Sequence, residues 1–92
     1  TQIFYSPNNN QSQNLADCIR NSVKKCLQPE NERQCKKADG SIYLLKKAEN
    51  PSVIVECGFI SNPDELAKLQ NDEYQKEMAT SIVTGFLDYT HQ

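Results

Sequence analysis

The sequence predicts a small α/β domain. Three observations lead to this class. Short apolar runs alternate along the chain with amphipathic segments, so strands and helices are interleaved. The run 53–55 is apolar on both faces, which is typical of a central strand that helices cover on each side. The length of 92 residues allows one domain at most, here residues 1–92.

The first half of the chain predicts one strand, one long helix and one loop. Residues 1–6, TQIFYS, alternate briefly between apolar and polar side chains and predict a short strand. From about Ser12 to Gln28, apolar residues recur every three or four positions, which predicts an amphipathic helix. Its stripe contains Leu15, Ile19, Val23 and Cys26. Residues 29–40 are polar and charged and predict an exposed loop that closes at Gly40.

The second half predicts two strands and then two helices. The strands are SIYLL, residues 41–45, and SVIVECGF, residues 52–59. Asn62, Pro63 and Glu65 then carry the signature of a helix start. A last helix follows Asn71, and its expected core stripe contains Tyr74, Met78, Ile82, Phe86 and Tyr89. The predicted order is strand, helix, strand, strand, helix, helix. A strand covered on both faces is expected in a sheet of more than these three strands, so we expect additional sheet beyond what this chain supplies.

The composition narrows the classes of function. Ten basic and 12 acidic residues give a net charge of -2, so we expect neither nucleic acid nor an anionic membrane as a partner. The longest apolar run is far too short to span a membrane. The spacing of the four cysteines fits no zinc motif, and we expect free thiols that act as small hydrophobes. Their disulfide state stays open; they are Cys18, Cys26, Cys35 and Cys57.

The sharpest candidate for chemistry is Glu56, which ends the apolar run 53–55 without a neighbouring Lys or Arg in the sequence. Active sites of open α/β sheets gather at the carboxyl ends of strands, and Gly58 would let the backbone turn closely beside the acid. A partly apolar setting suits a general acid/base. The alternative is a structural acid bonded to backbone N–H groups or to a distant arginine.

Three further groups have weaker claims. Cys57 would need a basic partner to act as a nucleophile, and the one histidine, His91, lies next to the C-terminus, so a packed thiol is favoured. Arg33 and Lys36 lie on the predicted loop, where such charges are usually solvated, although they could contact an anionic or amide-rich ligand. The chain offers no set of three ligands for a catalytic zinc.

The segment from Pro51 to Asn62, PSVIVECGFISN, resembles the C-terminal part of the zinc-dependent N-acetylmuramoyl-L-alanine amidases of the amidase-3 type. The stretch ERQCKKADGSIYLLKKAENP is similar to the family's Arg-X-X-Lys loop, which is followed by a Tyr-hydrophobic-Leu strand. FYSPNNNQSQNLADCI resembles the preceding strand and helix, so the resemblance covers nearly the whole chain. The matching loop and strand positions are Arg33, Lys36, Tyr43 and Leu45.

The resemblance implies a mixed sheet sandwiched by helices, of which this chain would be the C-terminal half. It also implies a peptidoglycan hydrolase that cleaves the amide bond between N-acetylmuramate and L-alanine. Glu56 would be the catalytic acid/base, and Arg33 and Lys36 would contact the substrate. The zinc ligands, two His and one Glu, would lie in an upstream half of the domain, and none of them is in this chain.

The resemblance also implies partners and a place of action. The partners would be peptidoglycan, the complementary N-terminal half or a second copy of the chain, and possible accessory proteins. Action would be extracytoplasmic, at the cell wall. VECGF and FYSPNN are similar to amidases of spore-forming bacteria, some of which act on the spore cortex during sporulation or germination. The competing interpretation is a non-catalytic fragment or binding module that contacts peptidoglycan or a partner protein through residues 31–37.

Overall fold

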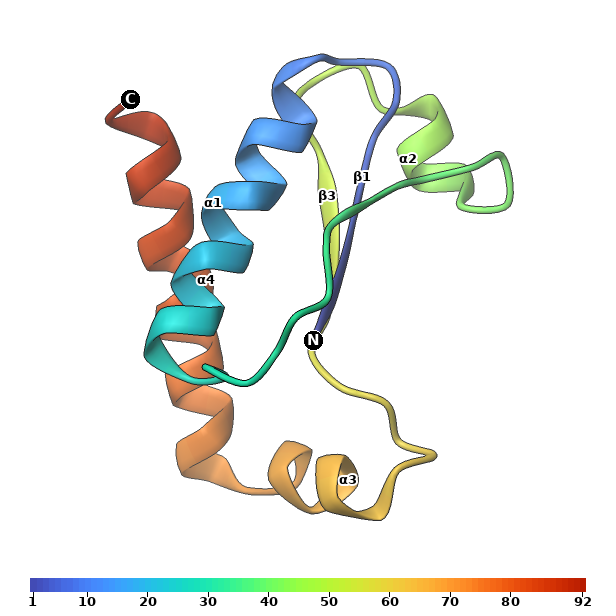
Figure 1. Cartoon of the computed structure of the whole chain (residues 1–92). Helices are drawn as coiled ribbons and strands as arrows, with labels where there is room; N and C mark the ends of the chain where they lie inside the picture. Colours follow the sequence, from blue (N-terminus) through green and yellow to red (C-terminus); the bar gives the residue numbers. More distant parts are fainter.

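A computed structural model describes all 92 residues as a three-stranded sheet with helices packed against it (Figure 1). The strand order is β2-β1-β3, with β1 at Gln2–Tyr5, β2 at Lys36–Lys37 and β3 at Val53–Glu56. Strand β1 runs parallel to β2 and antiparallel to β3, so the sheet is mixed. The predicted α/β class is confirmed.

The chain has two long and two short helices. Their bounds are α1 Gln11–Cys26, α2 Tyr43–Lys47, α3 Pro63–Leu69 and α4 Asp72–Thr90. The predicted helix starts are confirmed, because Asn62 Oδ1 accepts hydrogen bonds from the backbone N–H groups of Asp64 and Glu65. In the same way Asn71 Oδ1 accepts from the Tyr74 N–H at 2.9 Å. No helix combines the length and apolar character needed to cross a bilayer.

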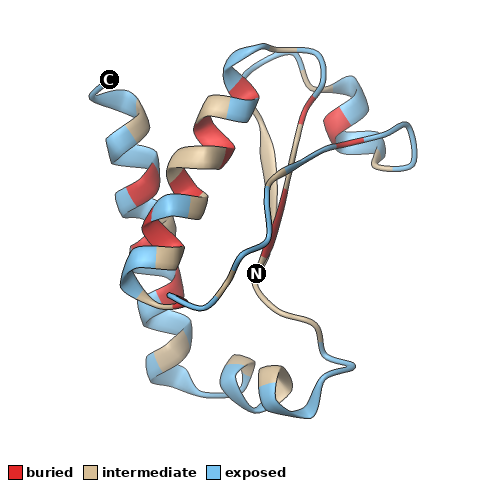
Figure 2. Ribbon diagram, viewed as in Figure 1, coloured by how far each residue is buried: buried red, intermediate tan, exposed pale blue.

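The register of the sheet decides which side chains meet the helices. Ile3 pairs with Val55, and Gln2 pairs with Glu56. Paired residues point to the same face, and neighbours along a strand point to opposite faces. Ile3 lies in the core, and Val53 and Val55 pack against it. Figure 2 shows the burial along the sheet, with buried residues in β1 and intermediate burial in β3. The second face carries Gln2, Phe4, Lys36, Ile54 and Glu56, and these residues are absent from the core cluster.

Strand β3 differs from its prediction as a central strand covered on both faces. It lies at the edge of the sheet and pairs only with β1. All four of its residues are only partly buried, since helices pack on one of its faces. Within this chain, helices therefore cover only one face of the apolar run of β3, and one edge of the strand is unpaired. This arrangement is compatible with the expectation of additional sheet.

The predicted strand over residues 41–45 is wrong, because Tyr43–Lys47 forms the helix α2. A short apolar run does not by itself distinguish a strand from a helix. Only Leu45 of this run is buried. The Ser6 hydroxyl donates to the Leu45 carbonyl at 2.8 Å, and the Asn8 amide donates to the Ala48 carbonyl at 3.0 Å, so the end of α2 has its acceptors satisfied.

The second strand along the chain, β2, lies instead in the segment predicted as an exposed loop. Residues Lys36–Lys37 pair with the free side of β1, and the Ala38 N–H donates to the Tyr5 carbonyl at 2.9 Å. Both lysines are exposed, as their charge predicts, and a two-residue strand has no apolar pattern to detect. Lysines on a short edge strand also discourage pairing with other chains.

The core lies between the sheet, α1 and α4. It contains Ile3, Leu15, Ala16, Ile19, Val23 and Met78. The predicted stripe of α1 is confirmed except for Cys26, which is exposed at the last residue of the helix. In α4, Tyr74, Met78, Ile82 and Tyr89 face the core as predicted. Phe86 does not, since 49% of its surface is exposed.

The place expected for Phe86 is taken by Gly85, because α1 and α4 approach each other very closely there. A Cβ atom on Gly85 would lie 2.5 Å from the Ile19 Cα and 2.9 Å from the Cys18 carbonyl oxygen. Nearby, the buried Ser22 hydroxyl donates to the Ser81 carbonyl at 2.6 Å. Small residues therefore set the distance between the helices, and the larger apolar residues pack on either side of them.

Gly85→Ala should destabilise the fold. Overpacking costs about 1–3 kcal/mol of unfolding free energy. We expect this cost to outweigh the gain of about 1 kcal/mol that alanine has over glycine inside a helix. The matched control is Gly40→Ala, since a Cβ atom at Gly40 would meet nothing within 4 Å. Urea denaturation measures both variants, and an unchanged or raised stability of Gly85→Ala would contradict the close helix contact.

Candidate functional site

Glu56 is the last residue of β3, and its side chain belongs to the face of the sheet opposite α1 and α4. The end of β3 lies beside the start of β1, where the Thr1 hydroxyl donates to the Cys57 carbonyl at 3.0 Å. Glu56 is partly buried. The one ion pair of the chain joins Lys24 to Glu32 at 2.8 Å, so no cation neutralises the Glu56 carboxylate.

The segment that follows Glu56 is held by α3 and by the loop after α1. The Phe59 N–H donates to Glu65 Oε1 at 3.3 Å, and its carbonyl accepts from the Asn62 N–H at 3.0 Å. The Arg33 guanidinium lies over the Phe59 ring, 4.8 Å from the ring centroid. Arg33 is itself held through its backbone, because Arg20 Nε donates to its carbonyl at 2.7 Å. The Phe59 segment is therefore fixed on two sides.

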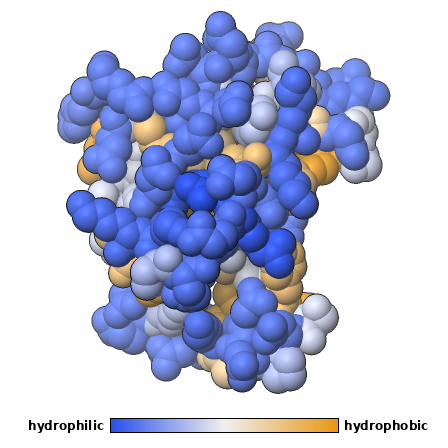
Figure 3. All heavy atoms as spheres, in the orientation of Figure 1, coloured by the Kyte–Doolittle hydropathy of each residue, from blue (hydrophilic) through white to orange (hydrophobic).

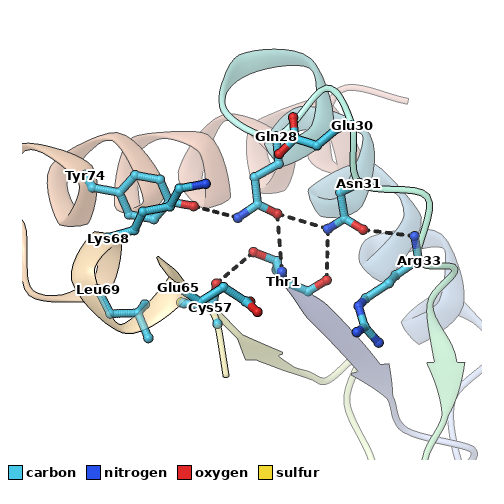
Figure 4. A pocket seen from close by; sticks show the side chains of 11 residues that line it. Thr1, Gln28, Glu30, Asn31, Arg33, Cys57, Glu65, Lys68, Leu69 and Tyr74 are labelled. Carbon is cyan, nitrogen blue, oxygen red and sulfur yellow. Dashed lines mark hydrogen bonds between the residues drawn. The ribbon is translucent and has the colours of Figure 1, made fainter. Parts of the chain in front are cut away.

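A polar pocket of about 150 Å³ opens beside this segment, on the helix side of the sheet (Figure 4). Gln28 connects its parts, because Gln28 Nε2 donates to the Tyr74 hydroxyl at 2.6 Å and Gln28 Oε1 accepts from Asn31 Nδ2 at 2.9 Å. Asn31 Nδ2 also donates to the Thr1 carbonyl at 3.0 Å. The network joins the end of α1 to β1 and α4. Charged side chains stand around it; they are Glu30, Arg33, Glu65 and Lys68.

The structure separates the two cations that the sequence suggested as substrate contacts. Arg33 lines the pocket and stacks on Phe59. Lys36 lies in β2 and pairs with Phe4, which puts it on the same sheet face as Glu56 and two strands away. Both are exposed. The face of the molecule drawn in Figure 3 is mainly hydrophilic. Their contact with substrate stays a prediction.

Cys57 has the packed position predicted for it. Strand alternation sends it to the face opposite Glu56, where it packs against the core. His91 follows the end of α4, at the far end of the helix from α3 (Figure 1). All four thiols are free. Burial, together with a hydrogen bond to Asp17, raises the pKa of the Cys35 thiol to about 12, so that thiol stays protonated at neutral pH.

The residues of this chain do not form a zinc site. Nowhere do three or more His, Cys, Asp or Glu side chains come together in a way that could hold a metal ion. A catalytic zinc needs three protein ligands. Zinc ligands of the complete protein would therefore have to come from residues outside these 92.

The sequence analysis did not predict the burial of two polar side chains beside the site. Gln28 and Gln2 are both buried, with exposed fractions of 8% and 3%. Glutamine is usually exposed, and a pattern of apolar residues says nothing about which amides are buried. The one available signal was the alternation of residues 1–6, which puts Gln2 on a strand without identifying its partner.

The fold is an α/β domain with a mixed sheet, and an unpaired carboxylate lies at the end of its antiparallel edge strand β3. Residues 1–88 match the family model of N-acetylmuramoyl-L-alanine amidase. The chain therefore belongs to the N-acetylmuramoyl-L-alanine amidase family.

Curated relatives and solved structures agree with this family. The germination-specific N-acetylmuramoyl-L-alanine amidase of Bacillus subtilis is 33% identical over 88 residues, which are 96% of this chain and 36% of the relative. The CwlD amidase of Clostridioides difficile, solved in complex with the GerS lipoprotein, is 38% identical with a TM-score of 0.92. That match covers 98% of this chain and 45% of CwlD. The amidase AmiC2 of Nostoc punctiforme has a TM-score of 0.86 at 28% identity, over 99% of this chain and 48% of AmiC2. The chain thus spans between about a third and a half of these relatives.

The contact of Arg33 with Phe59 predicts an energetic coupling between them. In a double-mutant cycle of Arg33→Met and Phe59→Leu, we expect a coupling of about 0.5–1 kcal/mol, the usual size for an exposed cation–π pair. The matched control replaces Lys36 by Met in the same cycle, and we expect no coupling there. Urea denaturation measures the unfolding free energies. Additive effects of Arg33→Met and Phe59→Leu would show that the guanidinium does not hold the Phe59 segment.

Proposed function

We propose that this chain is the C-terminal portion of an amidase catalytic domain, and that Glu56 is its general acid/base. The complete protein would cleave the amide bond between N-acetylmuramate and the L-alanine of the stem peptide. The observation that carries the proposal is the free Glu56 carboxylate at the end of β3, on the face of the sheet opposite α1 and α4. Family membership supports the reaction class.

The chemistry assigned to Glu56 is a pair of proton transfers. The carboxylate accepts a proton from the water that attacks the scissile carbonyl carbon. The same carboxyl group then delivers that proton to the amide nitrogen as the C–N bond breaks, so the stem peptide leaves as an amine. A positioned carboxylate performs both roles when it can reach the water and the leaving nitrogen. The core packing of the neighbouring residues Val55 and Cys57 fixes the strand end from which it acts.

The proposed reaction also needs a metal ion and substrate contacts beyond Glu56. The resemblance assigns Lewis-acid polarisation of the scissile carbonyl to zinc, which residues outside the chain would hold. Arg33 and Lys36 are the proposed substrate contacts. The expected partners are peptidoglycan and the upstream part of the domain, and the complex of CwlD with GerS suggests an accessory protein as a further one. Action is proposed at the cell wall, outside the cytoplasm, and the germination-specific relative favours the spore cortex as the substrate.

Glu56→Gln in the complete protein should lower the release of stem peptide by about 10²–10⁴-fold, the usual contribution of general acid–base catalysis. The amide keeps the shape of the side chain but cannot take up the proton. The measurement is the appearance of L-alanine amino termini in purified peptidoglycan, with bound zinc determined in parallel. The matched control is Glu49→Gln, an exposed acid before β3. Near-normal activity of Glu56→Gln with intact zinc would leave Glu56 as a structural acid.

The isolated chain should bind the upstream part of its domain or, without that part, a second copy of itself. The outer edge of β3 is unpaired. A groove of about 230 Å³ beside α4 is lined mainly by apolar side chains, among them Leu69, Met78 and Ile82. Such surfaces promote association. Light scattering after gel filtration should give a mass above 10.5 kDa for the chain alone. A well-folded monomer would contradict this expectation.

A further inference from the structure

The side chain of Gln2 is buried on the sheet face opposite α1 and α4 and has one unsatisfied polar atom. Only 3% of the residue is exposed. Gln2 Nε2 donates to the Gln34 carbonyl at 2.9 Å and to the Ile3 carbonyl at 3.3 Å. Both partners are acceptors, so the orientation of the amide is determined. Gln2 Oε1 is buried and receives no hydrogen bond. A buried acceptor without a donor is rare in folded proteins.

Gln2 lies directly opposite Glu56 in the antiparallel pair of β1 and β3. The Ser6 N–H donates to the Ser52 carbonyl at 3.0 Å, and this bond fixes the phase of the ladder. Counting in steps of two makes Gln2 and Glu56 a hydrogen-bonded pair. Side chains of such a pair share a face, with Cβ atoms about 4.5–5.5 Å apart. Two side chains of this length can meet across that distance.

We propose that Gln2 is a positioning residue for Glu56: Gln2 Oε1 accepts a hydrogen bond from the carboxyl group of Glu56 while that group carries the transferred proton. The inference rests on the proposed function of Glu56. The proton comes from the attacking water, resides on a Glu56 oxygen that donates to Gln2 Oε1, and then passes to the leaving amine. Gln2 itself neither gains nor loses a proton, because its oxygen is only an acceptor.

None of the other charged groups around this pair is positioned by the sheet register opposite Gln2 Oε1, which leaves Glu56 as the hydrogen-bond donor. On β2, Lys36 shares the face but pairs with Phe4, which is two residues along β1 from Gln2. Arg33 is stacked on Phe59, and Glu65 accepts from the Phe59 N–H. On β1, the residues of this face are uncharged. A protonated Glu56 is the donor that the register puts opposite the orphan oxygen.

The test replaces Gln2 by Met, which keeps the length of the side chain and removes its acceptor, in the complete amidase. We expect kcat for peptidoglycan cleavage to fall about tenfold, a part of the 10²–10⁴-fold that general acid–base catalysis contributes. KM should stay unchanged. The acid limb of the kcat/KM profile should move to lower pH, because the protonated form of Glu56 loses its acceptor.

The matched control is Ser6→Ala, directly after β1 and at the end away from Glu56. Ser6 is buried, and the variant loses the hydrogen bond to the Leu45 carbonyl and the one from the Asn8 N–H. It should lower stability without moving the pH profile. A Gln2→Met enzyme with the wild-type kcat and pH profile would overturn the inference, as would a loss of stability alone. Glu56→Gln separates the two proposals: if that variant is inactive while Gln2→Met keeps the wild-type profile, only the role of Gln2 fails. An active Glu56→Gln enzyme would remove both.

Discussion

The antiparallel register between β1 and β3 determines which of their side chains face the core and which face the other side of the sheet. It sends Ile3 and Val55 toward the helices and Gln2 and Glu56 toward the opposite face. A slip of β3 by one residue would turn Val55 away from the helices and Glu56 toward them, because side chains alternate along a strand. The core would then receive a carboxylate. The burial of Ile3 therefore fixes both the fold and the direction of the candidate acid.

The second constraint is the contact of α1 with α4 at Gly85. This contact lets the two longest helices form one layer over the sheet, and it orients α4 so that Met78 reaches the core. The other face of the sheet is left with half-buried apolar residues, such as Ile54, and with the candidate acid. That imbalance agrees with a chain that spans less than half of its relatives.

Much of this arrangement was predictable from the sequence. The strands around Ile3 and Val55, the long helix after residue 10 and the caps at Asn62 and Asn71 all follow from local patterns, and the structure confirms them. The position of Glu56 at a strand end followed from the same patterns. These features depend on side-chain periodicity and on capping chemistry, which neighbouring residues determine.

The errors arise where tertiary contacts decide. Part of the run 41–45 belongs to the helix Tyr43–Lys47, whose end is held by hydrogen bonds from Ser6 and Asn8, and both residues are distant in sequence. Gly85, and not Phe86, faces α1, because a helix contact this close requires a small residue. The hydrophobic pattern of the sequence does not reveal such a contact. The pairing of Gln2 with Glu56 depends on register, which a single strand does not reveal.

The central claim is that Glu56 belongs to an amidase site that this chain shares with residues outside it. The most direct test measures amide cleavage in purified peptidoglycan with added zinc, for the chain alone and for the same chain joined to its upstream part. The account predicts new L-alanine amino termini only from the joined protein. Cleavage by the chain alone, or no cleavage by a folded, zinc-loaded joined protein, would contradict it.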